Sequence, residues 1–176
     1  MNKVVCIILA GGRGSRFGSP LKFLSNICGK PLIEKLLNDV EILCEHAVIA
    51  LSKKTLRASY ICATNKYLST DCIETSGDDF VKDLVFLLDA LPKPLFMIAA
   101  DVYVQNREIL VDFLRRALEA QEDIITLTID DDREKLIGIT FFKKNCGSWR
   151  NISYPKNSVI DVDKVSDLEM VRRLCH

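Results

Sequence analysis

The sequence has no excess of charge of either sign. Its 24 Lys and Arg residues balance 24 Asp and Glu residues, so the formal net charge is zero. A nucleic-acid-binding protein usually carries a basic excess or stripe, whereas the basic clusters here are local. We therefore expect no nucleic-acid partner, and any anionic ligand should be small.

Long apolar runs and metal-binding cysteine pairs are also missing. The apolar run at residues 4–10 is short and passes directly into a glycine-rich segment, which is typical of a core strand and not of a signal peptide or membrane span. We expect a cytoplasmic protein with no membrane partner. The seven cysteines form no C-x-x-C pair, which argues against zinc. Their odd number and their apolar surroundings favour reduced thiols.

The remaining composition is that of an ordinary globular protein. Hydrophobic residues make up 48% of the chain, charged residues make up 27%, and the mean hydropathy is +0.13. A chain of 176 residues is about one domain long and can bury roughly 70% of its unfolded surface. We expect residues 1–176 to form one domain.

Strand-like apolar runs alternate with segments of helical periodicity, which predicts an α/β fold. Such alternation is typical of a mostly parallel sheet covered by helices on both faces, a Rossmann-like three-layer sandwich. Helices are expected from Pro31, from Gly77 to Leu91, behind Asn106, and behind a capping box of Ser166 and Glu169. The expected strands span residues 3–10, 46–51, 71–75, 94–100, 123–130, 136–142 and 158–162.

The most informative segment is the glycine-rich run from Leu9 to Gly18, LAGGRGSRFG, which follows the apolar strand. A strand that ends in such a turn brings several backbone N–H groups to one point, and this arrangement binds phosphate. Arg13, Arg16 and Lys22 add positive charge there. The segment therefore predicts a polyphosphate site.

Spacing separates three interpretations of these glycines. A dinucleotide-binding G-x-G-x-x-G needs glycine at Phe17 and an acidic residue after the second strand, where this chain has Ser52-Lys53-Lys54. A P-loop, G-x-x-x-x-G-K-[ST], would have to use the pair Gly29-Lys30. Pro31 follows this pair where the pattern requires Ser or Thr. A third interpretation is a tight turn with solvated arginines. Three glycines and three cations near one strand end favour a ligand site over that turn.

An N-terminal pattern and three further segments together resemble the MobA-like nucleotidyltransferase superfamily. The matching residues, in chain order, are Leu9 to Gly18, Lys22, Gly29 to Ile33, Thr75 to Gly77, Ala99 to Asp101, and Ile160 to Asp163 with Ser166 to Leu168. Within the superfamily, the short length and the run from Thr75 to Leu84 most resemble the archaeal-type GTP:adenosylcobinamide-phosphate guanylyltransferases.

The resemblance implies roles for the matched residues. The backbone of Gly11, Gly12 and Gly14 would hold phosphate, Arg13 or Arg16 would balance the leaving pyrophosphate, and Lys22 would act on the α-phosphate. Guanine of the substrate GTP would lie over the end of the first strand. The residues implied around the base and ribose are Leu9, Ala10, Thr75, Ser76 and Gly77. A cap of the following helix is an equally good interpretation of Thr75 and Ser76.

The resemblance also implies a Mg²⁺ ion. Asp101 ends a very apolar strand, where an unpaired carboxylate would be costly and a bound cation would supply its partner. Asp161 is the expected second ligand. Asp163 is an alternative, because alternation along a strand places both side chains on one face.

Other features leave alternatives open. The resemblance implies transfer of GMP from GTP to adenosylcobinamide phosphate in cobalamin biosynthesis. Molybdenum cofactor or a sugar phosphate is the alternative acceptor, and a non-catalytic nucleotide-binding module is a second alternative. The segment from Cys146 to Asn157, with Trp149, Arg150 and Tyr154, could shape an acceptor pocket or be a surface loop. The charge run 130–135 is expected to be a solvated turn. The formation of a homodimer stays open.

Overall fold

The computed structural model describes residues 3–130 and 135–175. Its centre is a seven-stranded sheet with the order β10-β8-β9-β6-β1-β4-β5. Strands β6, β1, β4 and β5 are parallel, and β9 runs antiparallel to both β6 and β8. The strands of this sheet are β1 (Val4–Leu9), β4 (Cys44–Ser52), β5 (Thr70–Thr75), β6 (Leu95–Ala99), β8 (Ile124–Asp130), β9 (Lys135–Phe142) and β10 (Trp149–Pro155).

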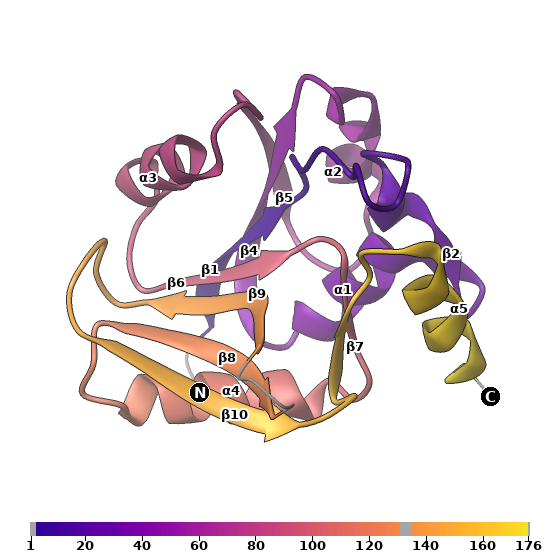
Figure 1. Cartoon of the computed structure of the whole chain (residues 1–176). Coiled ribbons are helices and arrows are strands. Elements are labelled where there is room, and N and C mark those ends of the chain that lie inside the picture. Colours follow the sequence, from indigo (N-terminus) through magenta and orange to yellow (C-terminus); the bar gives the residue numbers. More distant parts are fainter. Residues whose placement is uncertain (1–2, 131–134, 176) are drawn as a thin grey trace.

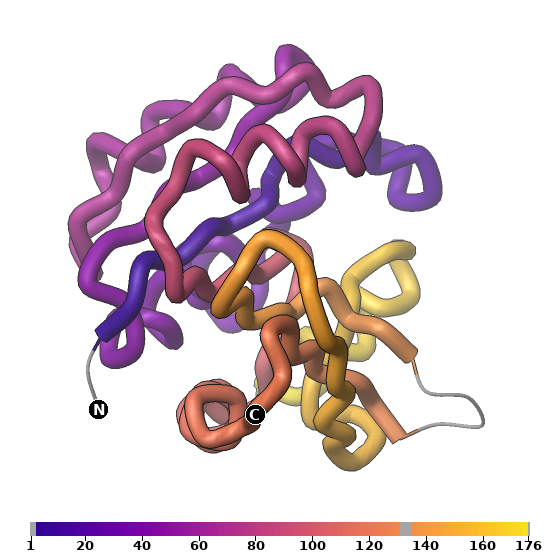
Figure 2. Tube along the Cα trace, turned by 90° about the vertical axis from the view of Figure 1, so that its left-hand side faces the viewer, coloured from indigo at the N-terminus to yellow at the C-terminus, as the bar shows by residue number. Residues whose placement is uncertain are grey.

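Helices cover both faces of the sheet, which confirms the predicted three-layer α/β fold (Figure 1). On one face, side chains of α1 (Leu32–Val40), α2 (Tyr60–Thr64) and α4 (Glu108–Glu119) pack into the larger apolar core. On the other face, Leu87 and Leu88 of α3 (Phe80–Ala90) pack near Ile7 and Met97. Figure 2 shows α3 lying over the indigo strand β1.

A smaller unit stands beside the main sheet. Strand β7 (Val102–Val104) pairs antiparallel with β11 (Val159–Asp161), and α5 (Val165–Arg173) packs against this pair around Val162 and Leu168. The prediction placed Asp161 at an end of the main sheet, which is wrong, because β11 belongs to this two-stranded sheet. The remaining elements are a hairpin of β2 (Asn26–Ile27) and β3 (Lys30–Pro31), with the short helices η1 (Lys22–Leu24) and η2 (Leu56–Ala58).

Three predicted helix starts are corrected. Helix α3 begins at Phe80 and not at Gly77, because the Asp79 carboxylate accepts the N–H groups of Val81 and Lys82. Helix α5 begins at Val165, and the carboxylate of Asp167 accepts the N–H of Lys164, so Ser166 and Glu169 are not its capping box. Pro31 directly precedes α1.

The first half of α3 is more exposed than its apolar pattern predicted. Phe80, Val81 and Val85 belong to the apolar pattern that predicts this helix, but they are 64%, 65% and 51% exposed, and only Leu87 and Leu88 of this helix are buried. The single face of α3 that contacts the sheet is too narrow to cover every apolar position of the helix.

The expectation of reduced thiols is wrong for six cysteines. Disulfides join Cys6 to Cys44, Cys28 to Cys175, and Cys62 to Cys72, while Cys146 is free and exposed. The sequence did not reveal the pairs because the topology brings together cysteines as far as 147 residues apart.

The segment from Cys146 to Asn157 contributes an edge strand. Residues Trp149–Pro155 form β10, which pairs in parallel with β8. The charge run 130–135 begins with exposed Asp130 and ends with exposed Lys135, and its middle lies outside the described residues. Within residues 3–130 and 135–175, the structure has no helix long and apolar enough to cross a membrane.

Candidate active site

The strand register brings the glycine-rich segment, the Thr75 segment and Asp101 to one edge of the sheet. Leu9 at the end of β1 pairs with Ala50 and with Ala99, and Ser52 at the end of β4 pairs with Thr75. These parallel strands end together, and ligands of open α/β sheets bind outside such ends.

A cavity of about 410 Å³ opens at this edge. Its lining includes six of the residues predicted for the nucleotide, Leu9, Ala10, Gly11, Gly12, Thr75 and Gly77, together with Arg13, Lys22 and Asp101. Apolar side chains of the sheet and of α3 complete its floor. They are Ala50, Leu84, Leu87 and Met97.

Two glycines allow the chain to approach closely here. Gly77 has a φ of +69°, and a Cβ at this residue would lie 2.4 Å from the Cβ of Ser52. Gly14 has a φ of +60°, and its Cβ would lie 1.8 Å from the carbonyl oxygen of Ser19. Any other residue would be strained at both positions and would also move neighbouring atoms.

The loop between β5 and α3 is fixed by Asp83, a residue of the motif to which the sequence assigned no role. Its carboxylate accepts the N–H of Ser76 at 3.0 Å, the N–H of Gly77 at 2.8 Å and the hydroxyl of Ser76 at 2.7 Å. Burial alone would raise the pKa of Asp83, but these bonds outweigh it and lower the pKa. Ser76 therefore faces Asp83 and is not among the cavity-lining residues, and the Thr75 hydroxyl donates to the Leu51 carbonyl.

A second cavity of about 410 Å³ adjoins the first and shares Gly12, Lys22 and Asp101 with it. It contains Gly14, Arg16, Asp161 and Asp163. Gly138 of β9 lines both cavities, although nothing in its sequence context indicated a site residue. The two cavities form one continuous cleft.

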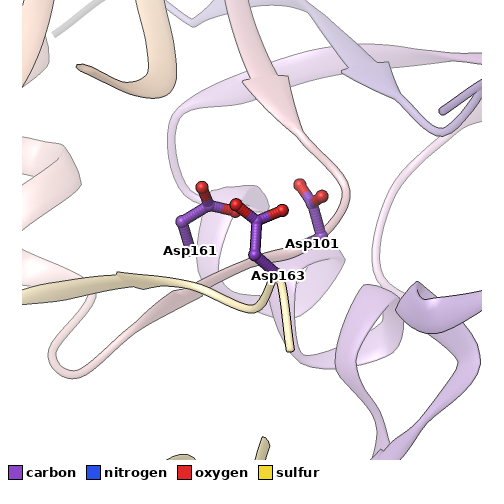
Figure 3. A group of neighbouring side chains, drawn as sticks. All are labelled: Asp101, Asp161 and Asp163. Carbon is purple, nitrogen blue, oxygen red and sulfur yellow. The ribbon is translucent and has the colours of Figure 1, made fainter. Parts of the chain in front are cut away.

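Three carboxylates meet in the second cavity. Asp101 follows β6, whereas Asp161 and Asp163 come from β11 and the segment after it, and their side chains point toward one another (Figure 3). Their ligand oxygens all lie within 4.8 Å of one another. The pairing of Asp161 with Val102, and the N–H of Val162 donating to the Asp101 carbonyl, hold the two segments together. Both alternatives for the second carboxylate, Asp161 and Asp163, are thus beside Asp101.

Cations partly balance these carboxylates. Lys22 Nζ lies 2.5 Å from Asp101 Oδ2 and 2.9 Å from Asp163 Oδ1, and Arg16 Nη1 lies 2.8 Å from Asp163 Oδ2. Burial lowers the pKa of Lys22, but the two carboxylates outweigh that effect and raise it, so Lys22 stays protonated. Arg13 is farther out and donates to the Asp78 carbonyl at 3.3 Å.

Asp161 has the weakest compensation of the three. Burial, reinforced by the negative charges of Asp101 and Asp163, raises the pKa of Asp161 to about 6. Its cation partner Lys135 has its Nζ 3.9 Å from Asp161 Oδ2. A cavity with three carboxylates and incomplete neutralisation has the hard oxygen donors that a divalent cation such as Mg²⁺ prefers.

We expect the Asp161 carboxyl of the metal-free protein to titrate with a midpoint near pH 6. Because its pKa in the folded protein lies above the unfolded value, ionisation lowers the free energy of unfolding as pH rises from about 4 to 6. Asp161→Asn should therefore stabilise the metal-free protein at pH 7 by roughly 1–3 kcal/mol. Carboxyl-carbon NMR and thermal unfolding in chelator test this. A midpoint near pH 4, or a less stable variant, would contradict it.

Comparison with known proteins identifies the family. Residues 6–153 match the family described as the MobA-like NTP transferase domain. The chain belongs to this family. It is a nucleotidyltransferase, and the predicted resemblance is confirmed.

The chain is also similar to individual proteins, and the solved structures among them share its fold. Adenosylcobinamide-phosphate guanylyltransferase of Methanocaldococcus jannaschii is 27% identical over 135 residues, which cover 73% of this chain and 69% of that protein. The structure of HddC from Yersinia pseudotuberculosis complexed with GMP-PN has a TM-score of 0.71 at 17% identity and covers 97% of this chain and 98% of its own. The inositol-1-phosphate CTP transferase from T. maritima has a TM-score of 0.72 at 12% identity, with coverages of 98% and 95%.

Proposed function

We propose that this nucleotidyltransferase transfers GMP from GTP to adenosylcobinamide phosphate. An oxygen of the acceptor phosphate attacks the α-phosphorus of GTP in line, the bond from that phosphorus to the bridging oxygen of the β-phosphate breaks, and pyrophosphate leaves. The products are adenosylcobinamide-GDP and pyrophosphate. The observation that carries the proposal is the convergence of the glycine-rich segment and three carboxylates in one cleft, in a chain similar to an adenosylcobinamide-phosphate guanylyltransferase.

The base and ribose of the nucleotide are assigned to the first cavity, and its phosphates to the glycine-rich segment, which lines both cavities. Backbone N–H groups of Gly11, Gly12 and Gly14 are suited to hold phosphate oxygens. The base lies over Leu9 and Ala10, beside the apolar floor of the first cavity. Thr75, Gly77 and the nearby Ser76 border the base and ribose, and the bonds from Asp83 fix the shape of this border.

Charge stabilisation is assigned to Arg13, Arg16 and Lys22. In-line phosphoryl chemistry depends on positioning and on neutralising the charge that develops on phosphate oxygens. Lys22 lies at the junction of the two cavities and is placed to contact the α-phosphate. Arg13 and Arg16 have longer and more exposed side chains, and they neutralise the charge of the departing pyrophosphate.

The residues fit a bound Mg²⁺, which Asp101 and Asp161 would hold with Asp163 as a further or alternative ligand. When bound, the ion supplies positive charge to the phosphate oxygens. Lys22 and Arg16 neutralise part of the carboxylate charge in the metal-free protein. Two cations against three carboxylates leave a net negative charge that a bound divalent cation would offset.

Mass spectrometry of complete reactions tests the function. The mixture contains the protein, GTP, Mg²⁺, pyrophosphatase and adenosylcobinamide phosphate, with ATP and CTP in parallel reactions. We expect adenosylcobinamide-GDP in the reaction with GTP and no corresponding product in the reactions with ATP or CTP. Its absence, with product formed from molybdenum cofactor or a sugar phosphate instead, would refute the acceptor assignment and leave the family unchanged.

A further inference from the structure

The second cavity has an apolar rim that the chemistry of phosphate transfer does not require. Phe80, the first residue of α3, is 64% exposed, and Leu136 of β9 is 56% exposed. Single exposed apolar residues are common on protein surfaces. These two come from elements far apart in sequence, yet both line the cavity that holds Asp161 and Asp163.

We propose that Phe80 and Leu136 bind an apolar ring face of the phosphate acceptor and so select its class. The class is a phosphate monoester carried on a large ring system with apolar faces, as opposed to a small polyhydroxylated sugar phosphate. This inference rests on the proposed function, because it assigns the part of the second cavity beside Phe80 and Leu136 to the acceptor.

The distribution of charge in the cavity supports this orientation. Lys22 lies beside two of the carboxylates, lines both cavities and attracts the phosphate end of the acceptor. The apolar side chains Phe80, Leu136, Ile137 and Phe17 line the second cavity. An aromatic ring and a leucine remove apolar surface of a ligand from water, but they offer no hydrogen bonds to sugar hydroxyls. The cavity therefore matches a molecule with one anionic end and a large ring system whose faces are apolar.

Phe80 also lies where the two cavities meet, since it lines both. An acceptor body resting on this ring would hold its phosphate close to the bound nucleotide, which is the positioning that in-line attack needs. Leu136 lines only the second cavity, so it isolates the contribution of the acceptor from that of the nucleotide.

The helix supplies a matched control. Phe86 belongs to α3 as well and is 51% exposed, but it lines neither cavity. Phe86 is six positions after Phe80, so its side chain is rotated by about 240° around the helix axis and lies on a different face. Phe86→Ser therefore makes the same chemical change at similar exposure, away from the cleft.

Calorimetry tests the inference separately from catalysis. Adenosylcobinamide phosphate is titrated into protein saturated with Mg²⁺ and a non-hydrolysable GTP analogue. We expect Phe80→Ser and Leu136→Ser each to raise the Kd of the acceptor about tenfold or more, with Phe80→Leu largely restoring it. Phe86→Ser should leave the Kd within about twofold of the wild type. In the wild type, glucose 1-phosphate should bind much more weakly.

Each contrary result has a distinct meaning. An unchanged acceptor Kd in both serine variants, equal loss in Phe86→Ser, or no acceptor binding by the wild type would overturn the inference. Weaker binding of the GTP analogue with an unchanged acceptor Kd would assign Phe80 to the nucleotide. If the acceptor binds as expected but the wild type forms no adenosylcobinamide-GDP, the proposed function fails and the apolar subsite stands.

Discussion

Asp101→Asn should lower the turnover number of guanylyl transfer by about 100-fold or more. The substitution preserves size and removes one of the three negative charges that meet in the cleft. It also removes the carboxylate 2.5 Å from Lys22 Nζ, so the lysine loses one of its two ionic partners. Binding of GTP should weaken much less, because most proposed nucleotide contacts belong to the backbone of residues 11–14.

The measurement is kcat at saturating GTP, acceptor and Mg²⁺, with thermal unfolding to verify the fold. Asp71→Asn is the matched control. Asp71 is on β5 of the same sheet, its side chain is 79% exposed, and it lines neither cavity. We expect wild-type kcat from that control. Wild-type kcat from Asp101→Asn would remove Asp101 from the proposed mechanism.

Loss of the Cys28–Cys175 disulfide should destabilise the oxidised protein by about 5 kcal/mol. This bond joins residues 147 positions apart, and a crosslink over a long loop restricts the unfolded chain most. For a chain of this size, the loss corresponds to a fall in Tm of roughly 10–20 °C. The bond also connects the β2–β3 hairpin to the end of α5, the helix that follows Asp161 and Asp163.

The Tm of Cys28→Ser is compared with that of the wild type under non-reducing conditions. Cys146→Ser is the control, because Cys146 is exposed and unpaired, and its Tm should equal that of the wild type. In excess reductant, the wild type and Cys28→Ser should converge. A Tm of oxidised Cys28→Ser within about 2 °C of the wild type would show that this bond contributes little.

Local sequence signals predicted much of the proposed nucleotide site. The glycine positions, the cations at 13, 16 and 22, and the apolar strand before them indicated the segment after β1, because the proposed phosphate-binding turn depends on residues close in sequence. The same holds for Thr75 and Gly77, which line the first cavity. Ser76 was predicted beside them, but its hydroxyl is bound by Asp83. The side chain of Asp83, seven residues away, therefore determines the orientation of the Ser76 hydroxyl.

Apolar periodicity predicted α3 but not which of its apolar residues would be covered. Phe80 and Leu88 satisfy the same pattern, yet Leu88 contacts the sheet and Phe80 borders the cleft. Burial depends on where a helix ends relative to the surface that it covers, and that is set by the packing of other elements.

The sequence by itself determined the α/β class, the glycine-rich segment after the first strand and the family, because alternating periodicity and motif spacing are local properties of the chain. Only the tertiary structure decided that Asp163 joins Asp101 and Asp161, that Lys22 lies between two of them, and that six cysteines pair. These contacts bridge residues up to 147 positions apart. Their existence depends on strand order and on the β7–β11 pairing, which no short segment encodes alone.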